Sequence, residues 1–230
     1  MQKKILEGLS NRLLSSLSRD QFDLLSPYIS TELFDRDDIL IEAGDEIENV
    51  YFPLSGMLSL LAVLKDGKAI ETATVGRDGA VGAMAGLGVY ISQVRVVVRF
   101  TAQLIKIPAS RFRKVAAKSE AIRDLGIKYN ENLLSQARIT AACNTVHLIE
   151  PRFCRWLLRA TDQAESDSIY LTQEFLAGTL GVRRTSVTDV ARKVQEAGAI
   201  SYSRGTITVL DRRILERLSC ECYATLLEQS

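Results

Sequence analysis

Segment 172–190 restricts the possible folds of this chain more than any other feature, because it matches two short helices joined by a tight turn. Thr172 can cap the first helix, since a threonine hydroxyl accepts a hydrogen bond from a backbone N–H group of the first turn. Gly181 stands at the turn, where a positive φ is cheap only for glycine. Small and apolar residues supply a shared core: Leu176, Ala177, Leu180, Val182, Val187 and Val190. This register favours a helix-turn-helix over an ordinary helical hairpin.

A β-hairpin is predicted directly after this segment. Two runs rich in β-branched residues, 200–203 and 206–209, flank Arg204-Gly205, which is typical of a tight turn between antiparallel strands. The formal net charge of the whole chain is only +1, but the part from 169 to 213 carries more basic than acidic side chains. Because a local positive patch attracts nucleic acid whatever the net charge, we expect this winged helix to contact double-stranded DNA.

The second helix of the motif should turn a polar face outward. Arginine that donates two hydrogen bonds to guanine is the commonest specific contact in the major groove, and the start of this helix is the part that reaches the bases. The predicted base-contacting residues are Arg184, Thr185, Thr188 and Asp189. Contacts to phosphates position a protein without selecting a sequence. The predicted phosphate-contacting residues are Thr172, Arg183, Arg192, Lys193 and Arg204, and the alternative for Arg183 is a solvated surface position.

Short apolar runs broken by turn residues occupy the chain from residue 39 to residue 100, after a helical leucine pattern at Leu6, Leu9, Leu13 and Leu17. Many short strands at near-regular spacing are typical of a sandwich or barrel. From 110 to 148 there is neither proline nor a turn cluster, so one or two helices are expected. We predict an α+β chain of three parts: a β domain over 1–118, a long helix and hinge over 119–149, and the winged helix over 150–230.

An apolar seam follows the predicted long helix at a spacing of three or four residues. A second copy of the chain could bury this seam, and so could the chain's own β domain, since periodicity alone does not distinguish the two. We expect a dimer interface made of Ile122, Leu125, Tyr129, Leu133, Ala137 and Ala141. A two-fold dimer would place two recognition helices about one DNA turn apart on a palindrome.

Nearly the whole chain resembles the Crp/Fnr family, the regulators named for the cyclic-AMP receptor protein and the fumarate-nitrate reduction regulator. The similarity is strongest in segments 171–177, 181–187 and 204–212, and weaker within 44–56. The resemblance implies an N-terminal sensor β-roll (a cupin-like double-stranded barrel) with flanking helices, a long dimerisation helix and a C-terminal winged helix-turn-helix. It also implies a transcription regulator that binds a palindromic operator as a homodimer and contacts RNA polymerase.

The sensor part departs from the family members that bind cyclic AMP. Those members hold the ribose with a Gly-Glu pair and the phosphate with an arginine followed by serine or threonine, whereas this chain has Ala83 in place of the glutamate and Val96 after Arg95. Cyclic AMP is therefore not expected to be the ligand, and the effector is left open. The expected effector pocket consists of Gly82, Ala83, Met84 and Arg95. The family's oxygen sensors use N-terminal cysteines, but the first cysteine here is Cys143, so no iron–sulfur cluster is expected.

The remaining cysteines and the single histidine lead to no assigned site. Cys220 and Cys222 form a Cys-x-Cys pair, for which apolar packing and a redox or metal role are the alternatives. A pair alone cannot complete a tetrahedral site, and His147 is distant in sequence, so no metal is predicted. With one histidine and no serine elbow, no acid–base constellation can be nominated, and we expect no enzymatic activity.

The chain is expected to be cytoplasmic and free of membrane contact. No run approaches the roughly 20 apolar residues of a membrane span, and charges are scattered through the first residues. The alternative function is a ligand-sensing or protein-interaction module that never binds DNA. Arg184 beside a basic wing argues against that alternative.

Overall fold

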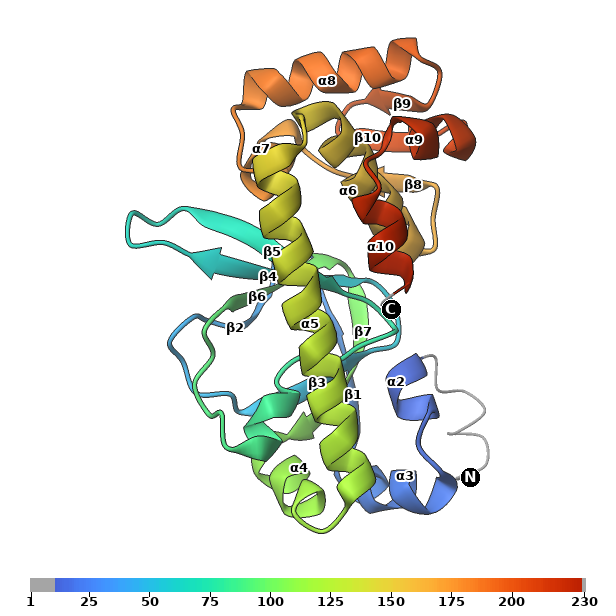
Figure 1. Ribbon diagram of the computed structural model, residues 1–230. Coiled ribbons are helices and arrows are strands. Elements are labelled where there is room, and N and C mark those ends of the chain that lie inside the picture. The colour runs from blue at the N-terminus through green and yellow to red at the C-terminus, as the bar shows by residue number, and fades with distance from the viewer. Residues whose placement is uncertain (1–10, 229–230) are drawn as a thin grey trace. The chain divides into compact units, whose positions relative to one another are not determined.

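The computed structural model describes residues 11–228, which form two compact units (Figure 1). The first unit contains the described residues up to Ala62 together with Ala73–Leu134, and the second contains Val63–Thr72 and the described residues from Ser135 onward. Leu6 and Leu9 of the expected leucine pattern lie outside the described residues. Within residues 11–228, no helix is both long enough and apolar enough to cross a membrane.

Two β-sheets form the roll of the first unit, in agreement with the predicted α+β fold. One sheet has three strands in the order β1-β7-β3, and the other has four strands in the order β2-β6-β4-β5. The strands are β1 (Ser30–Phe34), β2 (Ile39–Ile41), β3 (Asn49–Pro53), β4 (Met57–Val63), β5 (Ala69–Val75), β6 (Arg95–Phe100) and β7 (Ala102–Pro108). The short helices around them are α2 (Arg12–Ser15), α3 (Arg19–Leu25), η1 (Ser26–Tyr28), η2 (Ala83–Leu87) and α4 (Ala109–Ala116).

The core of the roll takes apolar side chains from both sheets. Phe52 of β3 and Leu104 of β7 come from one sheet, and Leu58 of β4 and Val98 of β6 come from the other, all of them fully buried. Phe112 of α4 packs against Phe52, with ring centroids 6.3 Å apart. Burying side chains of this size contributes roughly 1.5–3 kcal/mol each, so the roll has a core of its own.

Helix α5 (Glu120–Val146) packs one face on this core, which corrects the expected dimer seam. Ile122, Leu125 and Tyr129 are buried among the roll side chains at 7% exposure or less, and Leu133 is partly buried against them. The alternative that the sequence left open, packing against the chain's own β domain, therefore holds for these residues. A helix face that packs on the roll and one that packs on a second chain show the same helical period. The spacing of the apolar residues therefore could not tell which partner buries them.

A different face of α5 leaves apolar side chains exposed. Ile127 is 52% exposed and Leu134 is 41% exposed. Ala141 is exposed seven residues further on, and Ala137 is half-buried. Ile127, Leu134 and Ala141 repeat every seven residues, so they lie along one side of the helix.

The second unit contains the winged helix. Its three-stranded sheet has the order β8-β10-β9 with antiparallel pairing, so the predicted hairpin β9–β10 is extended by a strand that the sequence did not predict. The strands are β8 (Ser168–Tyr170), β9 (Ile200–Ser203) and β10 (Thr206–Val209). The helices are α6 (Ile149–Ala164), α7 (Gln173–Leu180), α8 (Arg184–Glu196), α9 (Arg212–Leu218) and α10 (Cys222–Glu228).

Candidate nucleic-acid interface

Helices α7 and α8 form the helix-turn-helix. Thr172 caps α7, because its hydroxyl oxygen accepts a hydrogen bond of 3.1 Å from the backbone N–H of Phe175. Gly181 takes a φ of +65° in the turn, where a side chain would be strained. Val187 and Val194 of α8 are fully buried, so the opposite face of the helix is the one that meets solvent. This local chemistry fixes where α8 begins and which of its side chains point outward.

The outer face of α8 carries a dense set of polar side chains. Asp189 lies 3.9 Å from Arg192 across one helical turn, and both side chains are 67% exposed. An exposed pair of this kind contributes little to stability, so both groups can exchange it for other partners. The predicted contact residues that the structure leaves exposed are Arg183, Arg184, Thr185, Thr188, Asp189, Arg192, Lys193 and Arg204.

Two of these positions differ in detail from the simple expectation. The Thr188 hydroxyl donates to the side-chain oxygen of Gln173 at 2.9 Å, so it braces α8 against α7. Arg183 occupies the N-cap of α8, but its side chain makes no capping hydrogen bond. Backbone N–H groups at such a helix start attract anions, because the helix dipole adds a partial positive charge there.

The wing and the two helices border one open groove. Arg204 and Gly205 both have positive φ values, +50° and +80°, as the two-residue turn of a tight hairpin requires. The groove has a volume of about 620 Å³. It is lined by Tyr170, Thr172, Gln173, Glu174, Arg184, Tyr202, Arg204 and Gly205. The structure thus brings Thr172, Arg184 and Arg204 together, and adds Gln173 and Tyr202, for which the sequence predicted no contact.

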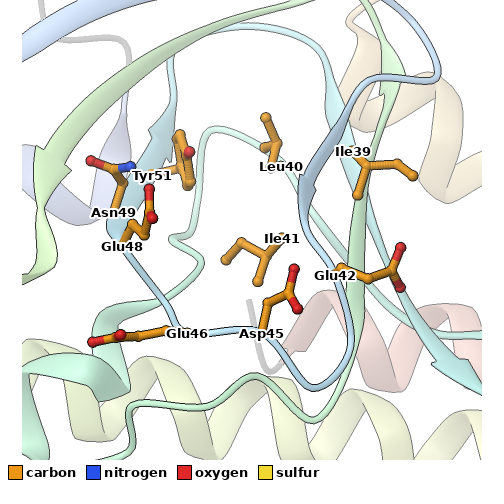
Figure 2. Close-up of a pocket in the computed structure, with 9 residues that line it drawn as sticks. All are labelled: Ile39, Leu40, Ile41, Glu42, Asp45, Glu46, Glu48, Asn49 and Tyr51. Carbon is orange, nitrogen blue, oxygen red and sulfur yellow. The ribbon is translucent and has the colours of Figure 1, made fainter.

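A pocket in the roll is strongly acidic (Figure 2). Its volume is about 410 Å³, and Glu42, Asp45, Glu46 and Glu48 are among its lining residues. The guanidinium of Arg95 donates to both carboxylate oxygens of Glu42, at 2.8 and 2.9 Å. This hydrogen bonding lowers the pKa of Glu42. The guanidinium of Arg95 is therefore already paired with a carboxylate. The negative charge of the other carboxylates around the pocket would repel a phosphate.

The predicted effector residues do not line this pocket. Gly82 has a φ of +82°, and a Cβ there would stand 2.7 Å from the backbone oxygen of Asn49. Ala83 is buried in the roll core, and Met84 follows it in η2. The chain thus uses the loop around Gly82 for close packing.

Two family models match the chain. The cyclic nucleotide-binding domain matches residues 31–119, and the Crp-like helix-turn-helix domain matches residues 151–218. The chain belongs to the Crp/Fnr family. It is a DNA-binding transcription regulator, as the sequence predicted.

Solved structures of Crp/Fnr proteins share this fold. A protein from Eubacterium rectale assigned to the family has a TM-score of 0.72 at 21% identity, over 91% of this chain and 98% of that chain. FixK2 from Bradyrhizobium japonicum has a TM-score of 0.71 at 15% identity, over 84% and 98%. TTHB099, a CRP-family regulator from Thermus thermophilus, has a TM-score of 0.69 at 18% identity, over 82% and 96%. None of the curated proteins compared with this chain matches it.

Proposed function

We propose that this Crp/Fnr regulator binds a palindromic operator as a homodimer, with α8 in the major groove. The observation that carries the proposal is the joint exposure of Arg184 at the start of α8 and Arg204 on the wing, which border one groove. Arg184, Thr185 and Asp189 would contact bases, with Thr188 close by. Arg192, Lys193 and Arg204 would contact phosphates, together with Thr172 and the start of α8 at Arg183.

The same proposal includes the location of the protein, its protein partner and the absence of catalysis. The protein would act in the cytoplasm, contact RNA polymerase and catalyse no reaction. Its support is the set of exposed basic side chains on α8 and the wing, together with a single histidine that does not line the groove between them.

Incubation of the full-length protein with fragmented genomic DNA, followed by sequencing of the bound fraction, tests this function. We expect a two-fold symmetric consensus whose half-site centres lie about 10 base pairs, one helical turn, apart. The Arg184→Ala/Arg204→Ala protein is the control and should recover no consensus. Recovery of fragments without any shared sequence by the wild-type protein would favour a module that does not select DNA.

The dimer would form along α5 through Ile127, Leu134 and Ala141. These residues share one side of the helix, and Ile127 and Leu134 are large apolar side chains that a single chain leaves exposed. A two-fold interface uses the same patch on both chains, which suits a helix that can pack against its own copy. This seam replaces the one predicted from periodicity, and Ala141 is common to both.

Cyclic AMP is expected to produce no saturable heat in calorimetry at millimolar nucleotide. The physical reason is the set of carboxylates around the roll pocket, together with the pairing of Arg95 to Glu42, which leaves a cyclic phosphate without a cationic partner there. The double variant Glu42→Gln/Arg95→Ala serves as the comparison. Saturable binding by the wild-type protein that disappears in this variant would overturn the expectation.

A further inference from the structure

Three cysteines and the single histidine meet at one point of the second unit. Cys143 and His147 lie one turn apart at the end of α5, and the His147 N–H donates to the Cys143 carbonyl at 3.1 Å. Cys220 lies between α9 and α10, and Cys222 is the first residue of α10. The four side-chain ligand atoms all lie within 4.8 Å of one another.

The spacing of these atoms fits a shared ion. The sulfurs of Cys143 and Cys220 are 3.6 Å apart, and the Cys222 sulfur is 3.7 Å from Nδ1 of His147. Zinc–sulfur bonds of about 2.3 Å in a tetrahedron place two sulfurs roughly 3.8 Å apart. A disulfide needs about 2.05 Å, and all four cysteines of the chain are free thiols. The cluster thus has the dimensions of a four-ligand metal site.

The histidine is held as a metal ligand usually is. Its Nε2 lies 3.2 Å from a carboxylate oxygen of Glu221, the residue between the two C-terminal cysteines. Ligating histidines generally donate the N–H of their second ring nitrogen to a carboxylate or carbonyl, which fixes the tautomer and the ring direction. Glu221 therefore leaves Nδ1 of His147 as the acceptor, turned toward Cys222.

The surroundings of the cluster are buried and include a positively charged side chain. Cys143 is fully buried, Cys220 and Cys222 are at most 9% exposed, and Ile139 packs against the three. Arg155 of α6 is buried as well, and its Nε has no hydrogen-bond partner within the described part of the chain. Three thiolates, a neutral imidazole and a divalent cation sum to one negative charge, which a buried guanidinium would balance.

Arg155 is close enough to act electrostatically on Cys143, Cys220 and Cys222. Metal binding would displace the thiol protons of these residues, because the thiolate is the form of cysteine that binds a metal ion.

We propose that Cys143, His147, Cys220 and Cys222 bind one Zn²⁺ ion, which fastens the C-terminal segment to the end of α5. Thiolate and imidazole ligands in a tetrahedron are the preferred set for zinc. All four positions are filled by the protein, so the ion would be structural and would have no open position for catalysis. A cluster of several irons would hold its ligands further apart than these atoms are.

Metal analysis of the full-length protein, purified without chelators, tests the proposal. We expect about one zinc per chain, as for a closed Cys₃His site. The Cys220→Ser/Cys222→Ser protein should lose the zinc. Cys154→Ser is the matched control, because Cys154 is also fully buried but stands outside the cluster, and it should retain the zinc.

Cobalt substitution provides an independent test of the coordination geometry. Co²⁺ added anaerobically to the zinc-free wild-type protein should give the visible bands of a tetrahedral ion and thiolate-to-metal charge transfer, and Zn²⁺ should displace it. His147→Cys should keep these bands with a shift toward all-thiolate ligation, whereas His147→Ala should weaken binding. Circular dichroism confirms that each variant is folded.

Two results would overturn the assignment. One is a wild-type protein that holds no more metal than the folded Cys220→Ser/Cys222→Ser protein, both when freshly purified and after anaerobic incubation with zinc. The other is iron with inorganic sulfide in place of zinc. Because metal content is measured without DNA, failure here is distinguishable from failure of the proposed operator binding.

Discussion

Replacement of Arg184 by alanine is expected to remove most of the sequence preference of this regulator. The side chain is exposed at the start of α8 and borders the groove between the helices and the wing. A bidentate contact from arginine to guanine is worth about 1–3 kcal/mol of discrimination. The ratio of affinities for operator and random DNA should therefore fall by roughly 5-fold to 150-fold.

Lys193→Ala is the matched control for this experiment. Lys193 is exposed on the same helix, where a phosphate contact is expected. Its loss should weaken binding to operator and random duplexes about equally and reduce the salt dependence by roughly one phosphate contact. Competition anisotropy on both duplexes at several salt concentrations gives the measurement. Equal losses on both duplexes for Arg184→Ala would contradict its role at a base.

Leu134→Glu is expected to yield a monomer that keeps a folded winged helix and loses tight operator binding. A carboxylate at the centre of an apolar seam would be buried without a partner if two α5 helices packed there. Coupling two half-sites through one dimer raises affinity by about 10²- to 10⁴-fold, and this gain should disappear. Sedimentation velocity and anisotropy on full and half operators measure the two effects.

Lys128→Glu supplies the control for the dimer experiment. It places the same side chain on α5, at an exposed position beside Ile127 but off the line of Ile127, Leu134 and Ala141. We expect it to remain dimeric. A Leu134→Glu protein that sediments as a dimer and binds the full operator as the wild type does would rule out this seam.

The helix-turn-helix could be predicted residue by residue because its determinants are local. The Thr172 cap, the positive φ at Gly181 and the buried valines of α8 all act within a short stretch of chain. The wing follows from Arg204-Gly205 for the same reason. Strand β8 was missed because only three residues form it, and its pairing partner lies in β10, far along the chain.

The faces of α5 could not be assigned from the sequence. Periodicity shows that Leu125, Tyr129 and Leu133 share a side, but it does not tell which neighbour covers that side. The roll covers it, and the exposed row is that of Ile127 and Leu134, which are seven residues apart.

The cysteine cluster could not be predicted from the sequence, because its ligands come from distant parts of the chain. Cys143 and Cys220 are separated by 77 positions, and His147 and Cys222 by 75. A ligand pattern within a short loop can be recognised by spacing, but here two half-patterns, Cys-x-x-x-His and Cys-x-Cys, meet only when the second unit folds. Either half alone supports apolar packing equally well.

The missing side-chain cap at the start of α8 links the stability of the free protein to DNA binding. A serine or threonine N-cap is worth on the order of 1 kcal/mol over a residue that cannot cap, and Arg183 forgoes it. A DNA phosphate bound there would accept hydrogen bonds from the free backbone N–H groups of the first turn of α8. Operator binding would then supply the capping interaction that the unbound protein lacks. A serine or threonine at position 183 would favour the stability of the unbound protein, whereas arginine leaves these N–H groups available to a phosphate.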